Sequence, residues 1–219
     1  MDFAAARKHM VDSQVRPNQV SDPRILQAMR QIPRERFVPP EIAFRAYVDE
    51  DVPLGGGRFL IEPMVIARLV QAAAVQPGER SLVAAAGTGY GSALLAACGV
   101  QVTALEEDPR LIAIAQAVLP ALAPSVMLVT GSVTAGWKAG APYDLILIEG
   151  AAEEIPAALP EQVKRDSGRI LTVRAFPGGV SHAAIGEVVA GPARVAWQPL
   201  FDCATPVLPS LRRAPSFVF

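Results

Sequence analysis

The residues best placed for chemistry in this 219-residue chain are a pair of glycines after an apolar run and an acidic residue further on. Gly87 and Gly89 stand in "SLVAAAGTGYGSALLA", where a strand-like run passes through a turn into an alanine-rich, helix-forming stretch. Glycines let a ligand approach the backbone, and the first amides of the next helix can bind its polar atoms. Glu106, about twenty residues downstream, is placed to accept the hydroxyls of a ribose. The pattern indicates a nucleotide-type site, although a tight packing turn uses the same glycines.

The spacing of the glycines separates the nucleotide ligands from one another. A dinucleotide site requires GxGxxG, and a nucleoside triphosphate site requires GxxxxGK followed by Ser or Thr. The loop "AAAGTGYGS" contains neither pattern. An adenosyl ligand without a pyrophosphate suits this loop better.

The elements around the loop alternate between strand and helix. Short apolar runs typical of buried parallel strands cover residues 80–86, 100–108, 126–131, 143–150 and 168–176, and helical stretches cover 62–75, 89–99 and 109–123. The alternation predicts an α/β fold with a doubly wound, mostly parallel sheet. Ligands of such sheets bind beyond the carboxyl ends of the strands, where the winding order reverses.

The loops at these strand ends therefore define the candidate site. They carry Ala85, Gly87, Thr88 and Gly89 after the first strand, Glu106 and Glu107 after the second, Gly131 and Ser132 after the third, and Glu149 and Gly150 after the fourth. Glu149 is equally well interpreted as an ordinary acid at the end of a strand. We expect the four loops to converge on one crevice.

Three regions are expected within a single domain. Residues 1–53 form an N-terminal helical extension, 54–175 form the α/β core that carries the candidate site, and 176–219 complete the fold with β structure that ends in "SFVF". In the extension, "SDPRILQAMRQI" predicts an amphipathic helix with Ser21 or Asp22 as its N-cap.

Composition narrows the class of protein. Hydrophobic residues make up 51% of the chain and charged residues 19%, and the net charge of −1 gives no basis for binding nucleic acid or an anionic membrane. Cys98 and Cys203 are isolated and predict free thiols rather than a disulfide or a metal site. Arg34, Glu35 and Arg36 are interpreted as a solvated or helix-capping charge run. The charged N-terminus does not resemble a signal peptide, so a cytoplasmic location is expected. The sequence does not define the oligomeric state.

A co-linear series of motifs resembles the protein-L-isoaspartate O-methyltransferases. It comprises "MVDSQVRPNQVSDPRILQAMRQIPRERFVP", "AYVDEDVPLGGGRFLIEPMVIARL", "AGTGYGSALLA", "VTALEEDPRL", "APYDLILIEGAAEEIPAAL" and "SGRIL", and extends over residues 8–175. The resemblance implies a Rossmann-like class I methyltransferase with S-adenosylmethionine as cofactor and S-adenosylhomocysteine as product. It implies methyl transfer to the carboxylate of an isoaspartyl residue in a damaged protein or peptide, a protein-repair reaction.

Several positions depart from the family's motifs. Gly87, Gly89, Tyr90 and Glu106 match the cofactor loop and the ribose acid, but the acid and first glycine of the family's "LEIGTGSGY" fall at Val83 and Ala85. The aspartate of the family's "GDG", which meets the adenine amino group, falls at Ser132, with Val133 after it. The family's "GQTISQP" is "GRFLIEP" here, so its hydroxyl residue falls at Ile61 and its last glutamine at Glu62. No catalytic residue is therefore assigned.

These departures predict a weakened enzyme. Each lost hydrogen bond to a charged partner removes roughly 1.5–3 kcal/mol of cofactor binding. An acceptor carboxylate is already ionised at neutral pH, so methyl transfer needs alignment more than a general base. Two other interpretations stay open: a non-catalytic binding or scaffold protein with the same fold, and a methyltransferase for a different acceptor.

Overall fold

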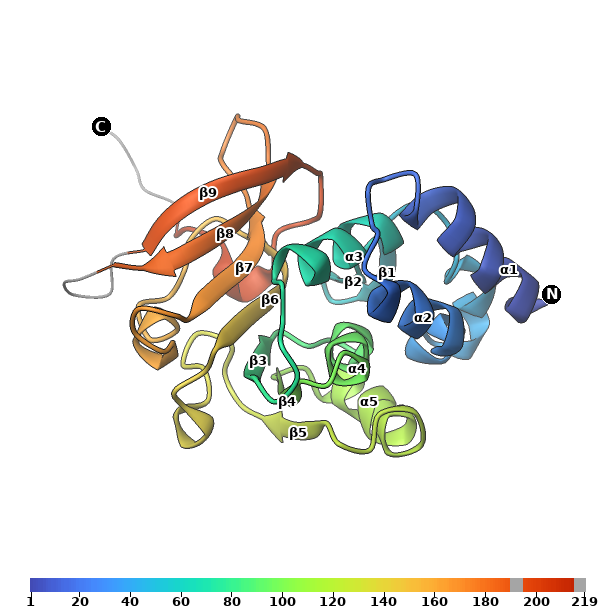
Figure 1. Ribbon diagram of the computed structural model, residues 1–219, viewed down its shortest axis with the longest axis horizontal. Coiled ribbons are helices and arrows are strands. Elements are labelled where there is room, and N and C mark those ends of the chain that lie inside the picture. Colours follow the sequence, from blue (N-terminus) through green and yellow to red (C-terminus); the bar gives the residue numbers. More distant parts are fainter. Residues whose placement is uncertain (190–194, 215–219) are drawn as a thin grey trace.

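The computed structural model describes residues 1–189 and 195–214, and a seven-stranded sheet forms its centre (Figure 1). The strands lie in the order β5-β4-β3-β6-β7-β8-β9. Their bounds are β3 (Arg80–Ala84), β4 (Gln101–Glu106), β5 (Met127–Thr130), β6 (Leu145–Ala152), β7 (Arg169–Arg174), β8 (His182–Val188) and β9 (Val195–Asp202). The five strands β3 to β7 are parallel to one another, and β8 and β9 are antiparallel to their neighbours. The winding order reverses between β3 and β6, which places the expected crevice at the carboxyl ends of these two strands.

The α-helices are α1 (Phe3–Met10), α2 (Pro23–Gln31), α3 (Pro63–Ala72), α4 (Tyr90–Ala97) and α5 (Pro109–Leu122). Aspartate side chains cap the start of α1, α2 and α5. Asp22 Oδ1 accepts from Arg24 N at 2.8 Å, and Asp108 Oδ1 accepts from Arg110 N at 2.9 Å. A proline follows each of these two caps and fits the first turn. The helix predicted at residues 21–32 is confirmed, with Asp22 rather than Ser21 as its cap.

Short helical turns and one hairpin complete the described elements. They are the π-helix η1 (Val11–Val15), the 3₁₀ helices η2 (Arg34–Phe37), η3 (Pro40–Arg45), η4 (Lys138–Gly140), η5 (Pro160–Gln162) and η6 (Pro209–Leu211), and the antiparallel hairpin of β1 (Val52–Gly55) and β2 (Arg58–Leu60). The expected strand "SFVF" at residues 216–219 lies outside the described residues.

The two faces of the sheet are covered differently. Helices α1 to α5 contribute buried side chains such as Met29, Leu69, Leu94 and Leu119 to the larger core cluster. The cluster on the opposite face is built from strands, loops and 3₁₀ turns, and no α-helix in residues 1–189 or 195–214 adds a buried residue to it. Helices α1 and α2 lie at the end of the molecule remote from the β8–β9 hairpin (Figure 1). The predicted α/β fold with a mostly parallel sheet and an N-terminal helical extension is confirmed.

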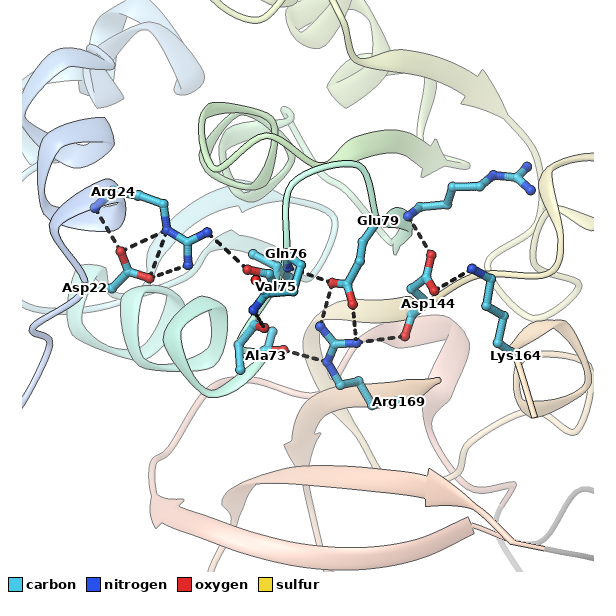
Figure 2. Close-up of polar contacts among 11 residues, drawn as sticks. Asp22, Arg24, Ala73, Val75, Gln76, Glu79, Asp144, Lys164 and Arg169 are labelled. Carbon is cyan, nitrogen blue, oxygen red and sulfur yellow. Dashed lines mark hydrogen bonds and ion pairs between the residues drawn. The ribbon is translucent and has the colours of Figure 1, made fainter. Parts of the chain in front are cut away.

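A network of ion pairs fastens the amino-terminal ends of the strands, as Figure 2 shows. Arg169 Nη2 contacts Glu79 Oε2 at 2.8 Å, and its other donors reach the carbonyl oxygens of Ala73 and Asp144. Lys164 Nζ lies 2.6 Å from Asp144 Oδ1. The network connects the segment between α3 and β3 with the starts of β6 and β7. It lies at the opposite end of the strands from the glycine loop.

Within the described part of the chain, no helix combines the length and the apolar character needed to cross a membrane.

Candidate functional site

The glycine loop follows β3 in a left-handed conformation. Ala85, Gly87 and Gly89 have φ angles of +57°, +59° and +95°. A residue with a Cβ atom costs roughly 1–2 kcal/mol in this region relative to a right-handed conformation, and glycine avoids that cost. Ala85 thus adopts a backbone conformation that favours glycine, at the expense of local strain.

Space for a ligand remains beside one of the glycines. A Cβ atom built on the buried residue Gly87 meets no atom within 4 Å beyond its chain neighbours. At Gly89 the same atom would lie 3.0 Å from the Leu119 side chain. The hydroxyl of Thr88 is directed elsewhere and donates to Phe37 O at 2.6 Å. A ligand can therefore approach the backbone more closely at Gly87 than at Gly89.

The Tyr90 ring lies beneath the N-terminal extension rather than in open space. The ring of Phe37 packs edge-on against it, with the ring centroids 5.3 Å apart. The guanidinium of Arg34 lies 4.8 Å from the Tyr90 centroid, and Tyr90 is fully buried. Tyr90 thus anchors η2 over the start of α4.

The predicted ribose acid is already saturated with donors. The Glu106 side chain is 0% exposed, and Arg58 approaches it with both terminal nitrogens, Nη1 to Oε1 at 2.7 Å and Nη2 to Oε2 at 2.8 Å. The amides of Gly87, Glu107 and Asp108 donate to the same carboxylate at 2.7, 2.9 and 2.9 Å. A carboxylate offers about four lone-pair sites. No acceptor position on Glu106 is left for ribose hydroxyls while Arg58 stays in place.

Arg58 reaches this position from the β1–β2 hairpin. Its side chain is 7% exposed, and Nη2 also donates to Ala85 O at 2.9 Å. The tip of the hairpin, residues 55–57, consists of glycines with positive φ. A Cβ at Gly56 would collide with the Arg110 guanidinium, and one at Gly57 would lie 3.1 Å from Pro209. The hairpin tip therefore lies between two other segments, and its arginine is directed toward the carboxyl ends of β3 and β4.

Glu149 lies within β6 rather than in the expected loop after that strand, and its buried carboxyl group packs against Gly91 at the start of α4. Its Oε2 atom has no hydrogen-bond partner among the described residues, and a Cβ at Gly91 would lie only 2.5 Å from it. Burial raises the pKa of Glu149 to about 8, and the nearby Glu106 carboxylate adds to this, whereas the Gly91 amide, Arg34 and Arg58 act in the opposite direction. Glu149 is therefore largely protonated at neutral pH and presents an unpaired oxygen.

The remaining predicted contacts lie at the rim. Glu107 and Ser132 are exposed, whereas Val133 is buried. Glu107 Oε2 accepts from Val133 N at 3.0 Å, and the Ser132 hydroxyl pairs with that of Thr134. The Gly131 amide donates to the Glu106 carbonyl at 3.1 Å, which joins the ends of β4 and β5. The structure thus brings the predicted loops together, with several of their polar groups bonded to one another.

Ile61 and Glu62, which stand at the family's hydroxyl residue and last glutamine, lie between β2 and α3. Ile61 is 1% exposed, and Glu62 precedes α3 with its amide bonded to Asp51 Oδ1 at 2.7 Å. Burial, together with the charges of Asp49 and Asp51, raises the pKa of Glu62 to about 7, and Arg34 opposes this. The Glu62 carboxyl is therefore divided between its neutral and charged forms near pH 7.

Two buried arginines make contacts at the site that local sequence patterns do not indicate. Arg34 was expected in a solvated or capping charge run, and this is wrong, because it is fully buried and donates to the carbonyls of Ala46 and Ile61. The glycine spacing and the strand pattern indicate no role for Arg58. Its signal was present in the loop, since it stands at the first glutamine of the family's "GQTISQP".

Gly87 and Glu149 fit an adenosyl cofactor, whereas Glu106 in its present contacts does not. The space beside Gly87 and the unpaired oxygen of Glu149 suit a ligand with a polar, cationic portion. Glu106 stands at the expected strand end, but its carboxylate is engaged by Arg58. A ribose fits this position only after Arg58 has moved.

Comparison with known proteins identifies the family. The family described as Protein-L-isoaspartate(D-aspartate) O-methyltransferase (PCMT) matches residues 5–175. A protein-L-isoaspartate O-methyltransferase of Methylorubrum extorquens (strain PA1) is 42% identical over 178 residues, which is 81% of this chain and 78% of that protein. One from Methylorubrum populi (strain ATCC BAA-705 / NCIMB 13946 / BJ001) is 39% identical over 175 residues, 80% of this chain and 82% of that protein.

A solved structure shares the fold. A putative protein-L-isoaspartate O-methyltransferase from Plasmodium falciparum, in complex with S-adenosyl-L-homocysteine, superposes with a TM-score of 0.76 at 17% identity and covers 93% of this chain and 98% of that one. The family match covers the glycine loop, the hairpin and Glu106. This chain belongs to the protein-L-isoaspartate O-methyltransferase family.

Proposed function

We propose that this protein is an S-adenosylmethionine-dependent O-methyltransferase that acts on the carboxylate of isoaspartyl residues in damaged proteins or peptides. The observation that carries the proposal is the family match over residues 5–175, which includes both the glycine loop and the β1–β2 hairpin. S-Adenosylhomocysteine would be the product. The single-domain organisation and the cytoplasmic location expected from the sequence stay predictions.

The residues proposed to hold the cofactor lie at or beside the carboxyl ends of β3, β4, β5 and β6 and at the start of α4. They are Ala85, Gly87, Thr88, Gly89, Tyr90, Glu106, Glu107, Ser132, Val133 and Glu149. Within this set, Gly87 supplies close backbone approach and Glu106 supplies the acceptor for ribose hydroxyls once Arg58 withdraws. The protonated carboxyl of Glu149 would ionise more readily next to a cation.

The cofactor, when bound, supplies a methyl group on a positively charged sulfur, and the acceptor carboxylate needs no further activation. The chain's own contribution is to exclude water and to align the acceptor. Arg34 fixes the backbone directly after the β1–β2 hairpin through the Ile61 carbonyl. Ile61 offers no hydroxyl to orient a carboxylate, and an ionised Glu62 repels one. We therefore expect slower transfer than in a family member with the intact motif.

Methyl transfer to a synthetic isoaspartyl peptide tests the proposal. Mass spectrometry should detect a methyl ester on this peptide, and none on the matched peptide that contains ordinary aspartate. Methylation of neither peptide by protein that binds S-adenosylhomocysteine would contradict the isoaspartyl assignment.

The buried Arg58–Glu106 pair favours a second candidate, a non-catalytic protein that retains the fold. This candidate predicts that neither S-adenosylmethionine nor S-adenosylhomocysteine raises the melting temperature at millimolar concentration, where even a weak site would do so. A rise in the melting temperature would show that the cofactor binds, and a methyl ester on the isoaspartyl peptide would eliminate this candidate.

A further inference from the structure

We infer that Arg58 is an internal competitor for the ribose position, so that cofactor affinity is set by the free energy needed to remove its guanidinium from Glu106. This inference rests on the proposed function, because it concerns the same crevice. It adds an affinity-determining residue on the β1–β2 hairpin and gives that hairpin a gating role.

The Arg58 guanidinium occupies the position on Glu106 that is expected for the ribose. A guanidinium bound through two parallel contacts of 2.7 and 2.8 Å occupies both oxygens of the Glu106 carboxylate. Ribose hydroxyls would require these same oxygens. Since backbone amides take the other positions on the carboxylate, the guanidinium and the ribose exclude one another.

The hydrogen bonds of Arg58 indicate a residue that can leave. Its Nε atom is buried and has no partner among the described residues, and its third contact is with the carbonyl of Ala85, a residue in the left-handed region. A buried donor without a partner destabilises the closed position. Water or solvent-exposed acceptors would satisfy this donor after the side chain swings outward.

The hairpin provides a route for that movement. Residues 55–57 form a glycine tip, which carries no side chains, and its neighbours Arg110 and Pro209 come from other segments. Arg110 is exposed and is itself paired with Asp108. Because one side of this contact is an exposed surface side chain, the tip can separate from it without opening the core.

The test compares two substitutions of Arg58 with a matched control. Arg58→Gln removes the charge and matches the first glutamine of the family loop. Arg58→Lys keeps a charge next to Glu106 but loses the paired contacts. The control is Arg169→Gln, which removes another arginine–glutamate pair. That pair, with Glu79, lies at the opposite end of the strands.

Calorimetric titration of each full-length variant with adenosine and with 2′,3′-dideoxyadenosine isolates the ribose. We expect Arg58→Gln to bind adenosine at least about tenfold more tightly than the unmodified protein, or 1.4 kcal/mol. Affinity for the dideoxy compound should change much less, Arg58→Lys should be intermediate, and Arg169→Gln should bind like the unmodified protein. Circular dichroism melting of each variant verifies that it is folded.

Each contrary result has a defined meaning. Unchanged or weaker adenosine binding in folded Arg58→Gln overturns the inference and makes Arg58 a ligand contact or a purely structural residue. If Arg58→Gln does not fold, the same result in Arg58→Lys overturns it. Tighter binding without methyl transfer to the isoaspartyl peptide supports the inference and contradicts the proposed function. Absence of adenosine and S-adenosylhomocysteine binding in every folded variant contradicts both.

Discussion

Replacing Glu149 with glutamine should make the free energy of unfolding much less dependent on pH. The pKa of Glu149 is raised from 4.5 to about 8 by its burial, so the folded state retains a proton that the unfolded state releases above pH 4.5. Stability contributed by the protonated carboxyl is therefore full below pH 4.5 and is lost as the pH rises through about 8. With 1.36 kcal/mol for each pKa unit, the loss between pH 5 and pH 8.5 is on the order of 4 kcal/mol.

Urea denaturation at the two pH values measures this effect. The difference in unfolding free energy between Glu149→Gln and the unmodified protein should shift by that amount in favour of the variant at pH 8.5. Glu161→Gln, which changes an exposed carboxyl group to the same amide, serves as the control and should show a constant difference. A constant difference for Glu149→Gln as well would refute the reasoning and would mean that Glu149 ionises in the folded protein as readily as in the unfolded one.

Three further perturbations test the neighbouring residues. Glu106→Gln breaks the buried ion pair with Arg58 and turns an NH2 group toward backbone amides that need an acceptor, so urea denaturation should show a loss of about 3–5 kcal/mol. A loss below about 1 kcal/mol would show that the pair is not buried in solution. The double change Ile61→Ser and Glu62→Gln restores the family's hydroxyl and amide, and kcat/KM for an isoaspartyl peptide should rise at least about tenfold, or 1.4 kcal/mol; a folded variant without this gain would mean that these residues do not limit alignment. Because the pKa of Glu62 is raised to about 7, its repelling charge appears as the pH rises through that value, so kcat/KM should fall between pH 6 and pH 8 in the unmodified protein, whereas an equal fall in Glu62→Gln would assign the titration to another group.

The sequence predicts the parts of this fold that depend on local patterns. Apolar runs bounded by turn residues predict the strands from β3 to β7, and the Asp22 cap followed by proline predicts the start of α2. These signals are contained in a few consecutive residues. The position of Glu106 at the end of β4 follows in the same way, because its strand is recognisable and its neighbour in the sheet is the strand before the glycine loop.

The contacts that decide the properties of the site are not local. Arg58 and Glu106 are 48 positions apart, and their contact depends on how the hairpin folds back over the sheet. The local charge pattern at Arg34 predicts the wrong burial, because a run of charged residues normally indicates a solvated surface. Its burial depends on the carbonyls of Ala46 and Ile61, and on the face of Tyr90, which come together only in the folded chain.

A crystal structure of the full chain saturated with S-adenosylhomocysteine tests the central claim most directly. We predict that the ribose hydroxyls lie within hydrogen-bond distance of the Glu106 carboxylate, beside Gly87, and that the Arg58 guanidinium has moved away from that carboxylate. A ligand bound elsewhere on the protein, or one bound in the crevice with the Arg58–Glu106 pair intact, would contradict the account.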